Sequence, residues 1–191
     1  MTYLIAGLII FFGVHSLPMR PALRGRMRER LGDLGYKAAF ALVSLLGLVL
    51  IVYGYGMARA AGSPILYSPP LWMSHITILL MAPVFVLLVA AYAPTGTVKA
   101  RSKHPMILAV KIWALAHLLA NGDLASVVLF GSFLAWGVVD RISLKRRGDI
   151  GGAGALRKSI AGDAISVVVG LGLYVAFVVY LHAWLIGVPV I

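Results

Sequence analysis

The sequence contains no cysteine and few acidic residues. Among its 191 residues, six are aspartate or glutamate and 17 are lysine or arginine, and the one glutamate is Glu29. The absence of cysteine excludes disulfides, thiolate metal ligands and thiol redox chemistry, so histidine is the best remaining ligand for a borderline metal. The aspartates fall at predicted helix ends: Asp33, Asp123, Asp140, Asp149 and Asp163. Acid–base catalysis by paired carboxylic acids is therefore poorly supplied.

Charge of either sign is scarce within long apolar runs. Charged residues make up 12% of the chain, 61% of residues are hydrophobic, and the mean hydropathy is +0.97. These values indicate an integral membrane protein. Apolar runs near the roughly 20 residues that a spanning helix needs recur at about 2–25, 36–58, 70–92, 105–121, 122–140 and 163–187. We expect an all-α fold, a polytopic membrane helix bundle of about six transmembrane helices in one domain, residues 1–191.

The basic residues gather at alternate connections between the apolar runs. They flank the first connection (Arg20, Arg24, Arg26, Arg28, Arg30, Lys37), the third (Lys99, Arg101, Lys103) and the fifth (Arg141, Lys145, Arg146, Arg147, Arg157, Lys158). The positive-inside rule then predicts that both termini are non-cytoplasmic. The net charge of +11 follows from this topology and from attraction to anionic lipid, so we expect the lipid bilayer as partner and no nucleic acid. The first run lacks a basic n-region and an A-x-A-like cleavage site, which predicts a retained helix rather than a signal peptide.

Two connections have a distinctive composition. The first, "PMRPALRGRMRERLGDLG", suits either a short helix in the membrane interface or a solvated basic loop. The last, "RRGDIGGAGALRKSIAG", is glycine-rich but lacks phosphate-loop spacing, so we expect a flexible linker. Within the apolar runs, Gly7 with Gly13 and Gly170 with Gly172 predict close approach between helices.

The fourth and fifth apolar runs are joined by the short segment "NGD". We expect Asn121 and Gly122 to end one helix, with Gly122 in a left-handed turn, and Asp123 to accept the first amides of the next helix. Residues 105–120 cover only about 24 Å at 1.5 Å per residue. This length leaves open whether the hairpin crosses the whole bilayer.

Ionisable side chains inside membrane helices are functional candidates, because each is costly unless paired, hydrated or ligated. Trp113, His117 and Asn121 follow at i, i+4 spacing along one helical face. This face suits a buried cofactor or a polar seam against another helix. Lys111 lies on another side, where it can reach the cytoplasmic interface. The other histidines lie nearer helix ends, where water or a lipid headgroup can satisfy them: His15, His75, His104 and His182.

The histidine pattern favours one type of metal centre. A zinc site needs three or four convergent ligands at short spacing, such as H-x-x-x-H, and no such spacing occurs in the sequence. Single histidines on several helices instead suit haem b held between helices.

Two segments carry a family resemblance. "HSLPMRPALR" at 15–24 and "KHPMILAVKIWALAHLLANGDLASVVLFGSFLAWGVVDR" at 103–141 resemble the NnrU family of bacterial inner-membrane proteins, and the likeness covers nearly the whole chain. The resemblance implies a multi-pass protein of the bacterial inner (plasma) membrane with a role in denitrification, through nitrite and nitric oxide reductase expression. The family is related to 15-cis-zeta-carotene isomerase, a haem b membrane enzyme with histidine axial ligands, which implies redox or isomerase-like chemistry on a hydrophobic small molecule.

The resemblance also implies roles for individual histidines. His117 and His15 correspond to the haem ligand pair, and His104 lies beside the site. If the hairpin crosses the whole bilayer, His15 lies near the cytoplasmic face and His117 more than about 10 Å further out. One flat haem would then reach both histidines only awkwardly. A tilted or short hairpin removes this difficulty. Otherwise His75 or His182, in the same outward half as His117, is the alternate ligand.

Two further interpretations remain open. "RSKHP" resembles the R-HP motif of isoprenylcysteine-type membrane methyltransferases, which implies S-adenosylmethionine binding near Arg101 and His104. No glutamate follows Arg141, so the catalytic part of that pattern is missing. The third interpretation is a non-catalytic membrane assembly factor, in which His15 and His117 tolerate alanine.

Overall fold

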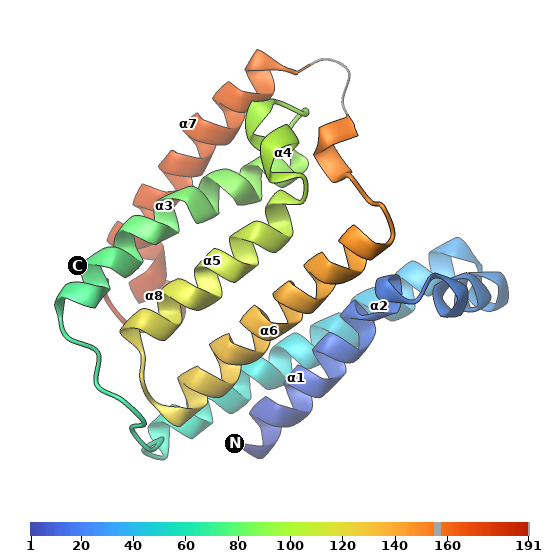
Figure 1. Ribbon diagram of the computed structural model, residues 1–191. Coiled ribbons are helices and arrows are strands. Elements are labelled where there is room, and N and C mark those ends of the chain that lie inside the picture. The colour runs from blue at the N-terminus through green and yellow to red at the C-terminus, as the bar shows by residue number, and fades with distance from the viewer. Residues whose placement is uncertain (155–157, 191) are drawn as a thin grey trace. The chain divides into compact units, whose positions relative to one another are not determined.

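The computed structural model describes residues 1–154 and 158–190, and over this range the regular structure is helical (Figure 1). Five helical segments are long and apolar enough to cross a membrane: Thr2–Met19, Pro21–Ala60, Trp72–Tyr92, Leu124–Gly154 and Ile160–Ile186. A sixth apolar helix, Pro105–Ala120, is shorter. The expected all-α membrane bundle is thus confirmed. Arg157, one of the predicted cytoplasmic basic residues, lies outside the described part of the chain.

The chain divides into two compact units. The first comprises Met1–Ser68 with Gly122–Ser132, and the second comprises Pro69–Asn121 with the described residues after Ser132. Helix α6 (Leu124–Arg146) contributes to both units. Each unit has its own candidate residues and is described separately below.

Prolines set the first helix boundaries of the first unit. Helix α1 (Thr2–His15) is followed by a single 3-10 turn, η1 (Leu17–Met19), and α2 (Pro21–Ala60) begins with proline at its first position. Proline lacks an amide hydrogen and fits the first turn of a helix but not its interior. The first helix therefore ends well before residue 25, the limit of the apolar run.

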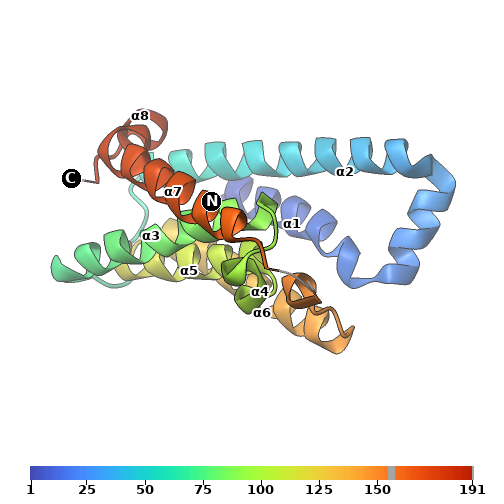
Figure 2. The ribbon, with the colours of Figure 1, turned by 90° about the horizontal axis from the view of Figure 1, so that it is seen from above.

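The basic connection after α1 is helical rather than a loop. Its residues form the first part of α2, which bends at Gly32, where φ is 71° and ψ is 168°. An exposed ion pair of 2.7 Å joins Arg28 to Asp33 across this bend. After the bend, α2 runs back along α1 (Figure 2).

Glycines bring α1 and α2 into close contact. A Cβ atom added at Gly7 would lie 2.6 Å from the amide nitrogen of Ile51, and one added at Gly47 would lie 2.9 Å from that of Phe11. At Gly54 an added Cβ would overlap the backbone of Leu4. The predicted close approach is confirmed for Gly7. It is wrong for Gly13, whose surroundings are open.

The second unit is built around α3 (Trp72–Tyr92), which packs against α5 (Pro105–Ala120) and α7 (Ile160–Ala176) (Figure 1). Val84, Leu87 and Ala109 form the buried core between α3 and α5. Gly170 contacts the backbone of Val86, whereas Gly172 faces open space, so the prediction of close approach holds for the first glycine only. Beyond α7 the chain continues as a π-helical turn, η3 (Phe177–Leu181), and the short helix α8 (His182–Ile186).

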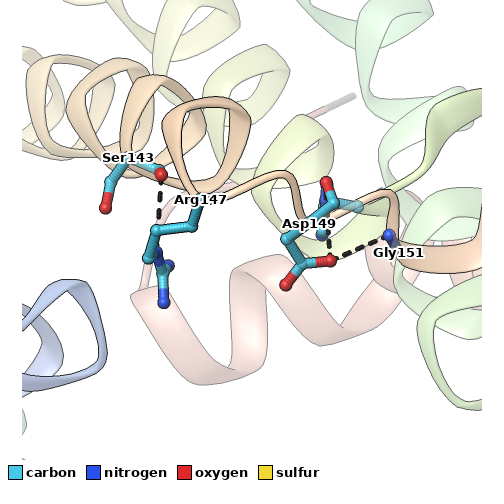
Figure 3. Close-up of polar contacts among 5 residues, drawn as sticks. Ser143, Arg147, Asp149 and Gly151 are labelled. Atoms are coloured by element: carbon cyan, nitrogen blue, oxygen red, sulfur yellow. Dashed lines mark hydrogen bonds and ion pairs between the residues drawn. The ribbon is translucent and has the colours of Figure 1, made fainter. Parts of the chain in front are cut away.

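The described part of the glycine-rich connection is structured. Gly151–Gly154 form a 3-10 turn, η2, beside the short helix α4 (Thr97–Ser102). The Gly152 amide donates to the Lys103 carbonyl at 2.8 Å. Figure 3 shows the Gly151 amide donating to the carboxylate of Asp149, at 2.8 Å. The described part of the expected linker thus contains a 3-10 turn, whose glycines permit close contact with the backbone of α4 and of Lys103.

The turn before α6 differs in part from the expectation. Asp123 caps α6, since its Oδ1 accepts the Ser126 amide at 3.1 Å. Gly122 is not among the residues with positive φ, so the predicted left-handed turn is wrong. Its carbonyl instead accepts the amides of Leu66 and Tyr67, at 2.8 and 3.2 Å, and a Cβ here would overlap the Tyr67 carbonyl. Close backbone approach is the reason for glycine at this position.

The α1–α2 contact predicts opposite outcomes for two glycines of α2. Gly54→Ala forces the α1 backbone away and should destabilise the protein by about 1–3 kcal/mol. Gly56→Ala meets no atom within 4 Å and gains helix propensity, so it should be neutral or stabilising by up to about 1 kcal/mol. Thermal unfolding of both variants in the same detergent measures the difference. Equal melting temperatures would contradict the packing described here.

Candidate functional site

His117 lies near the end of α5, on a helix held close to α3 by small residues. Ala109, Ala114 and Ala116 are fully buried. Their short side chains let the Thr77 hydroxyl of α3 donate to the Ala116 carbonyl at 2.7 Å. The residue before His117 is thus fixed to the neighbouring helix, which leaves the imidazole little freedom to move along the bundle.

The predicted column of Trp113, His117 and Asn121 is present and is joined through the backbone. His117 Nδ1 is 2.8 Å from the Trp113 carbonyl oxygen, and Asn121 Nδ2 donates to the His117 carbonyl at 2.9 Å. The indole and imidazole ring centroids are 5.3 Å apart. Trp113 also contacts Phe133 edge-on at 5.3 Å. Trp113 and Asn121 therefore set the position of His117, with Asn121 also closing the helix end.

His15 occupies a similar position at the end of α1. Its Nδ1 is 2.8 Å from the Phe11 carbonyl oxygen, and its ring stacks on Phe11 with centroids 3.9 Å apart. Phe40 of α2 approaches the same imidazole at 5.1 Å. The ring is half-buried among these aromatics. His15 belongs to the first unit and His117 to the second.

The hydrogen bonds fix the same tautomer in both histidines. A carbonyl oxygen only accepts, so each Nδ1 must carry the hydrogen and each neutral ring keeps its lone pair on Nε2. Metal-binding histidines characteristically donate their second ring N–H to a carbonyl or carboxylate in this way. His182 has the same arrangement, with Nδ1 2.7 Å from the Val188 carbonyl. In all three neutral imidazoles the lone pair is therefore on Nε2.

The remaining predicted site residues lie in the second unit. His104 Nε2 is 3.2 Å from the Asp149 carbonyl oxygen and 3.6 Å from its carboxylate, which ties this imidazole to the connection after α6. His75 is exposed in the first turn of α3. The stem of Lys111 lies against Gly137 of α6. Within the described residues, no three histidines, aspartates or glutamates gather into a cluster that could hold a metal ion.

A polar chain in the first unit was missed from the sequence. The Ser126 hydroxyl donates to Asp123 Oδ2 at 2.6 Å, so its oxygen must accept the hydrogen of the Tyr55 hydroxyl, 2.9 Å away. The Tyr55 oxygen in turn accepts from Arg59 at 3.1 Å. The donors run in one direction, from the guanidinium through two hydroxyls to the carboxylate. The sequence does show two local pairs at helical spacing, Tyr55 with Arg59 at i+4 and Asp123 with Ser126 at i+3. Only the fold brings the two pairs together.

The series of hydrogen bonds from Arg59 to Asp123 connects an exposed cation to a buried anion. Arg59 is exposed, whereas Asp123 is 7% and Ser126 0% exposed. Burial alone would raise the pKa of Asp123. The hydrogen bonds from the Ser126 hydroxyl and amide, the charge of Arg59 and a hydrogen bond with Ser63 outweigh burial and hold the pKa below its ordinary value. The carboxylate is therefore stabilised in its ionised form.

Removing one hydroxyl tests the hydrogen-bonded chain. Tyr55→Phe leaves the Arg59 and Ser126 groups without their shared partner and should cost about 1–3 kcal/mol of stability. The matched control is Tyr53→Phe on the same helix, because Tyr53 is 57% exposed and its ring still contacts Tyr3. Thermal unfolding measures both variants. A Tyr55→Phe protein as stable as the Tyr53→Phe protein would contradict the hydrogen bonds from Arg59 through Tyr55 to Ser126.

The depressed pKa of Asp123 predicts a pH dependence. A carboxyl group whose pKa is lowered by folding contributes stability that is complete above the unfolded pKa of about 3.9 and is lost as pH falls through the folded value. The melting temperature should therefore fall between about pH 5 and pH 3, and Asp123→Asn should flatten this fall. Asp33→Asn is the control, because its ion pair is exposed. Identical acid profiles for wild type and Asp123→Asn would overturn the assignment.

Comparison with known proteins supports the family resemblance. The chain matches the family described as "NnrU protein" over residues 3–190. No curated protein and no solved structure showed a significant match. The matched range includes α1 with His15 and α5 with His117. The chain is therefore a member of the NnrU protein family.

Proposed function

We propose that this NnrU-family membrane protein binds haem b through His117, with His15 as the second axial ligand that the family resemblance implies. The observation that carries the proposal is the shared tautomer of the two imidazoles, each fixed by an Nδ1 hydrogen bond to the carbonyl four residues earlier. The bond holds the ring in one orientation and makes Nε2 the more basic nitrogen. Both histidines lie in apolar helices, where ionisable side chains are candidates for a functional role.

The donor set suits haem better than a bare metal ion. A porphyrin supplies four nitrogens of its own, so the protein needs to provide only one or two axial ligands. A structural zinc site would need three or four protein ligands together. The aromatic surroundings also fit a flat apolar macrocycle, with Phe11 and Phe40 beside His15 and Trp113 beside His117.

His182 is the alternate partner of His117. It lies in the same unit as His117, and it has the same tautomer. Its ring also contacts Phe177 edge-on at 6.0 Å. His75 is a weaker alternate, since its side chain is exposed at the start of α3.

Bound haem would supply a redox-active iron, and the chain's own residues would bind and orient it. Trp113 and Phe11 hold the imidazole hydrogens through their carbonyl oxygens, and Asn121 closes the helix beneath His117. We propose a redox or isomerase-like role toward a hydrophobic small molecule, in a multi-pass protein of the bacterial inner membrane that supports denitrification. The charge pattern supports this placement, with basic connections toward the cytoplasm.

Visible spectroscopy tests the haem proposal. Protein purified from haem-replete cells should show a Soret band, and His117→Ala should remove most of it because an axial ligand is lost. His15→Ala should leave a weakened, shifted band. His75→Ala should leave the spectrum unchanged if His15 is the partner of His117, because the His75 side chain is exposed.

Two outcomes would count against this proposal. A wild-type protein without a Soret band, or a band indifferent to His117→Ala, would refute haem binding at His117. A band changed by His182→Ala but not by His15→Ala would replace the proposed pair with His117 and His182.

A further inference from the structure

An apolar groove runs along the second unit between α3 and α7, two helices that lie side by side in Figure 1. Its volume is about 470 Å³. It is lined by Leu88, Val89, Tyr92, Ala93, Ile165 and Leu173. None of these residues belongs to the histidine sites. The lining is almost entirely hydrocarbon, so the groove suits an apolar chain rather than a polar ligand.

Small residues on α7 explain why the groove forms. Gly162 and Gly170 lie against the backbones of Pro94 and Val86, and Ser166 between them is 2% exposed. Ile165 follows Gly162 by three residues, and Leu173 follows Gly170 by three. Both lie on the neighbouring face of α7 and are 43% and 45% exposed. The two helices therefore touch along one line, and the groove follows beside it, open on the apolar surface.

A cation lies at one end of the groove. Lys99 Nζ donates to the carbonyls of Ala91 and Ala93, at 2.9 and 3.1 Å, and Ala93 is itself part of the groove wall. An ammonium group has three donors, and carbonyls do not neutralise its charge. The sequence places this end of α3 at a basic connection, which the positive-inside rule assigns to the cytoplasmic face.

The nearby carboxylate does not cancel this charge. Asp163 accepts the amides of Thr97 and Val98, at 2.8 and 2.9 Å, so its two oxygens serve the start of α4. Lys158 interacts electrostatically with Asp163 and is exposed. Two lysines against one carboxylate leave a net positive charge at this end of the groove.

We propose that the groove binds an anionic phospholipid of the cytoplasmic leaflet, with an acyl chain along α3 and α7 and its phosphate at Lys99. The apolar wall and the cation at its end complement the two parts of such a molecule, and basic pockets between membrane helices on this side recognise anionic headgroups. A zwitterionic lipid would gain nothing net from the lysine. A second copy of this chain would bring a like charge to the same end.

Tryptophan quenching by brominated lipid tests the proposal. Ile165→Trp places an indole in the groove, and its added fluorescence over wild type is measured in phosphatidylcholine vesicles with a minor fraction of phosphatidylglycerol. One lipid is brominated at a time. Quenching by brominated phosphatidylglycerol should exceed that by an equal mole fraction of brominated phosphatidylcholine at least twofold. Raising the salt concentration should reduce the excess.

Two variants provide the controls. Val168→Trp places the indole on the same helix at a residue 71% exposed outside the groove, and its quenching ratio should be near one. Lys99→Gln in the Ile165→Trp protein keeps an N–H donor for the Ala91 and Ala93 carbonyls but removes the charge. It should lower the ratio to that of Val168→Trp, and Lys99→Arg should restore it.

Three results would overturn the proposal. A ratio of one for Ile165→Trp means non-selective lipid contact, and an excess that persists in Lys99→Gln means that Lys99 does not select the lipid. Weak quenching by both lipids, with cross-linking between chains, means that a second copy fills the groove. If the tryptophan variants do not fold, native mass spectrometry of the unmodified protein and of Lys99→Gln tests the site instead, by measuring the phosphatidylglycerol that each retains. Wild type should retain phosphatidylglycerol and the variant should lose it, and equal retention would refute the site.

Discussion

Polar groups within an apolar bilayer must find their partners inside the protein, and this chain meets that constraint largely through its own carbonyl oxygens. Thr77 donates to Ala116, Ser166 to Gly162 and Tyr174 to Ile78. Because water is absent from the bilayer core, each of these bonds replaces one that a soluble protein could leave to solvent. Ser44 is an exception among the described residues, since its hydroxyl is buried without a partner.

The same constraint prepares the histidines for coordination. An imidazole in a membrane helix must place its N–H on an acceptor, and the carbonyl four residues earlier is the nearest one. His15 and His117 both use it. The bond that makes each histidine tolerable in the membrane therefore also selects the nitrogen able to bind a metal. One hydrogen bond thus satisfies the imidazole N–H and leaves the lone pair on Nε2, which links the fold to the proposed haem.

The charges of the two units are stabilised in different ways. Asp123 and Arg59 are joined through two hydroxyls, so opposite charges stabilise each other across a short neutral bridge. Lys99 is held by neutral carbonyls instead and keeps its positive charge. The first arrangement satisfies its charges internally, while the second leaves a charge for an external partner such as a lipid phosphate.

The sequence predicts well those features that depend on average hydropathy over a segment or on residues three or four positions apart. The apolar runs predict the long helices because about 20 residues of hydropathy decide whether a segment enters a membrane. The cap at Asp123 and the column at Trp113, His117 and Asn121 depend on spacings of three or four residues, and the structure contains both. The resemblance in two segments was likewise enough to predict the family.

Features that depend on distant contacts were not predictable. Gly122 resembles a left-handed turn residue, yet its role is set by Tyr67, which only the fold brings near. Gly13 and Gly172 have the spacing of packing glycines, but a Cβ atom added at either would meet nothing within 4 Å. The chain from Arg59 to Asp123 combines two local pairs from different helices.

Electron paramagnetic resonance of the oxidised, haem-loaded protein at low temperature tests the central claim most directly, because the spin state of ferric haem reports its axial ligands. Two imidazoles predict a low-spin signal in the wild type. His15→Ala should convert the haem that it retains to high spin, and His117→Ala should lose the low-spin signal together with most of its haem. A high-spin wild type would contradict the pair, as would a low-spin signal that persists in both variants.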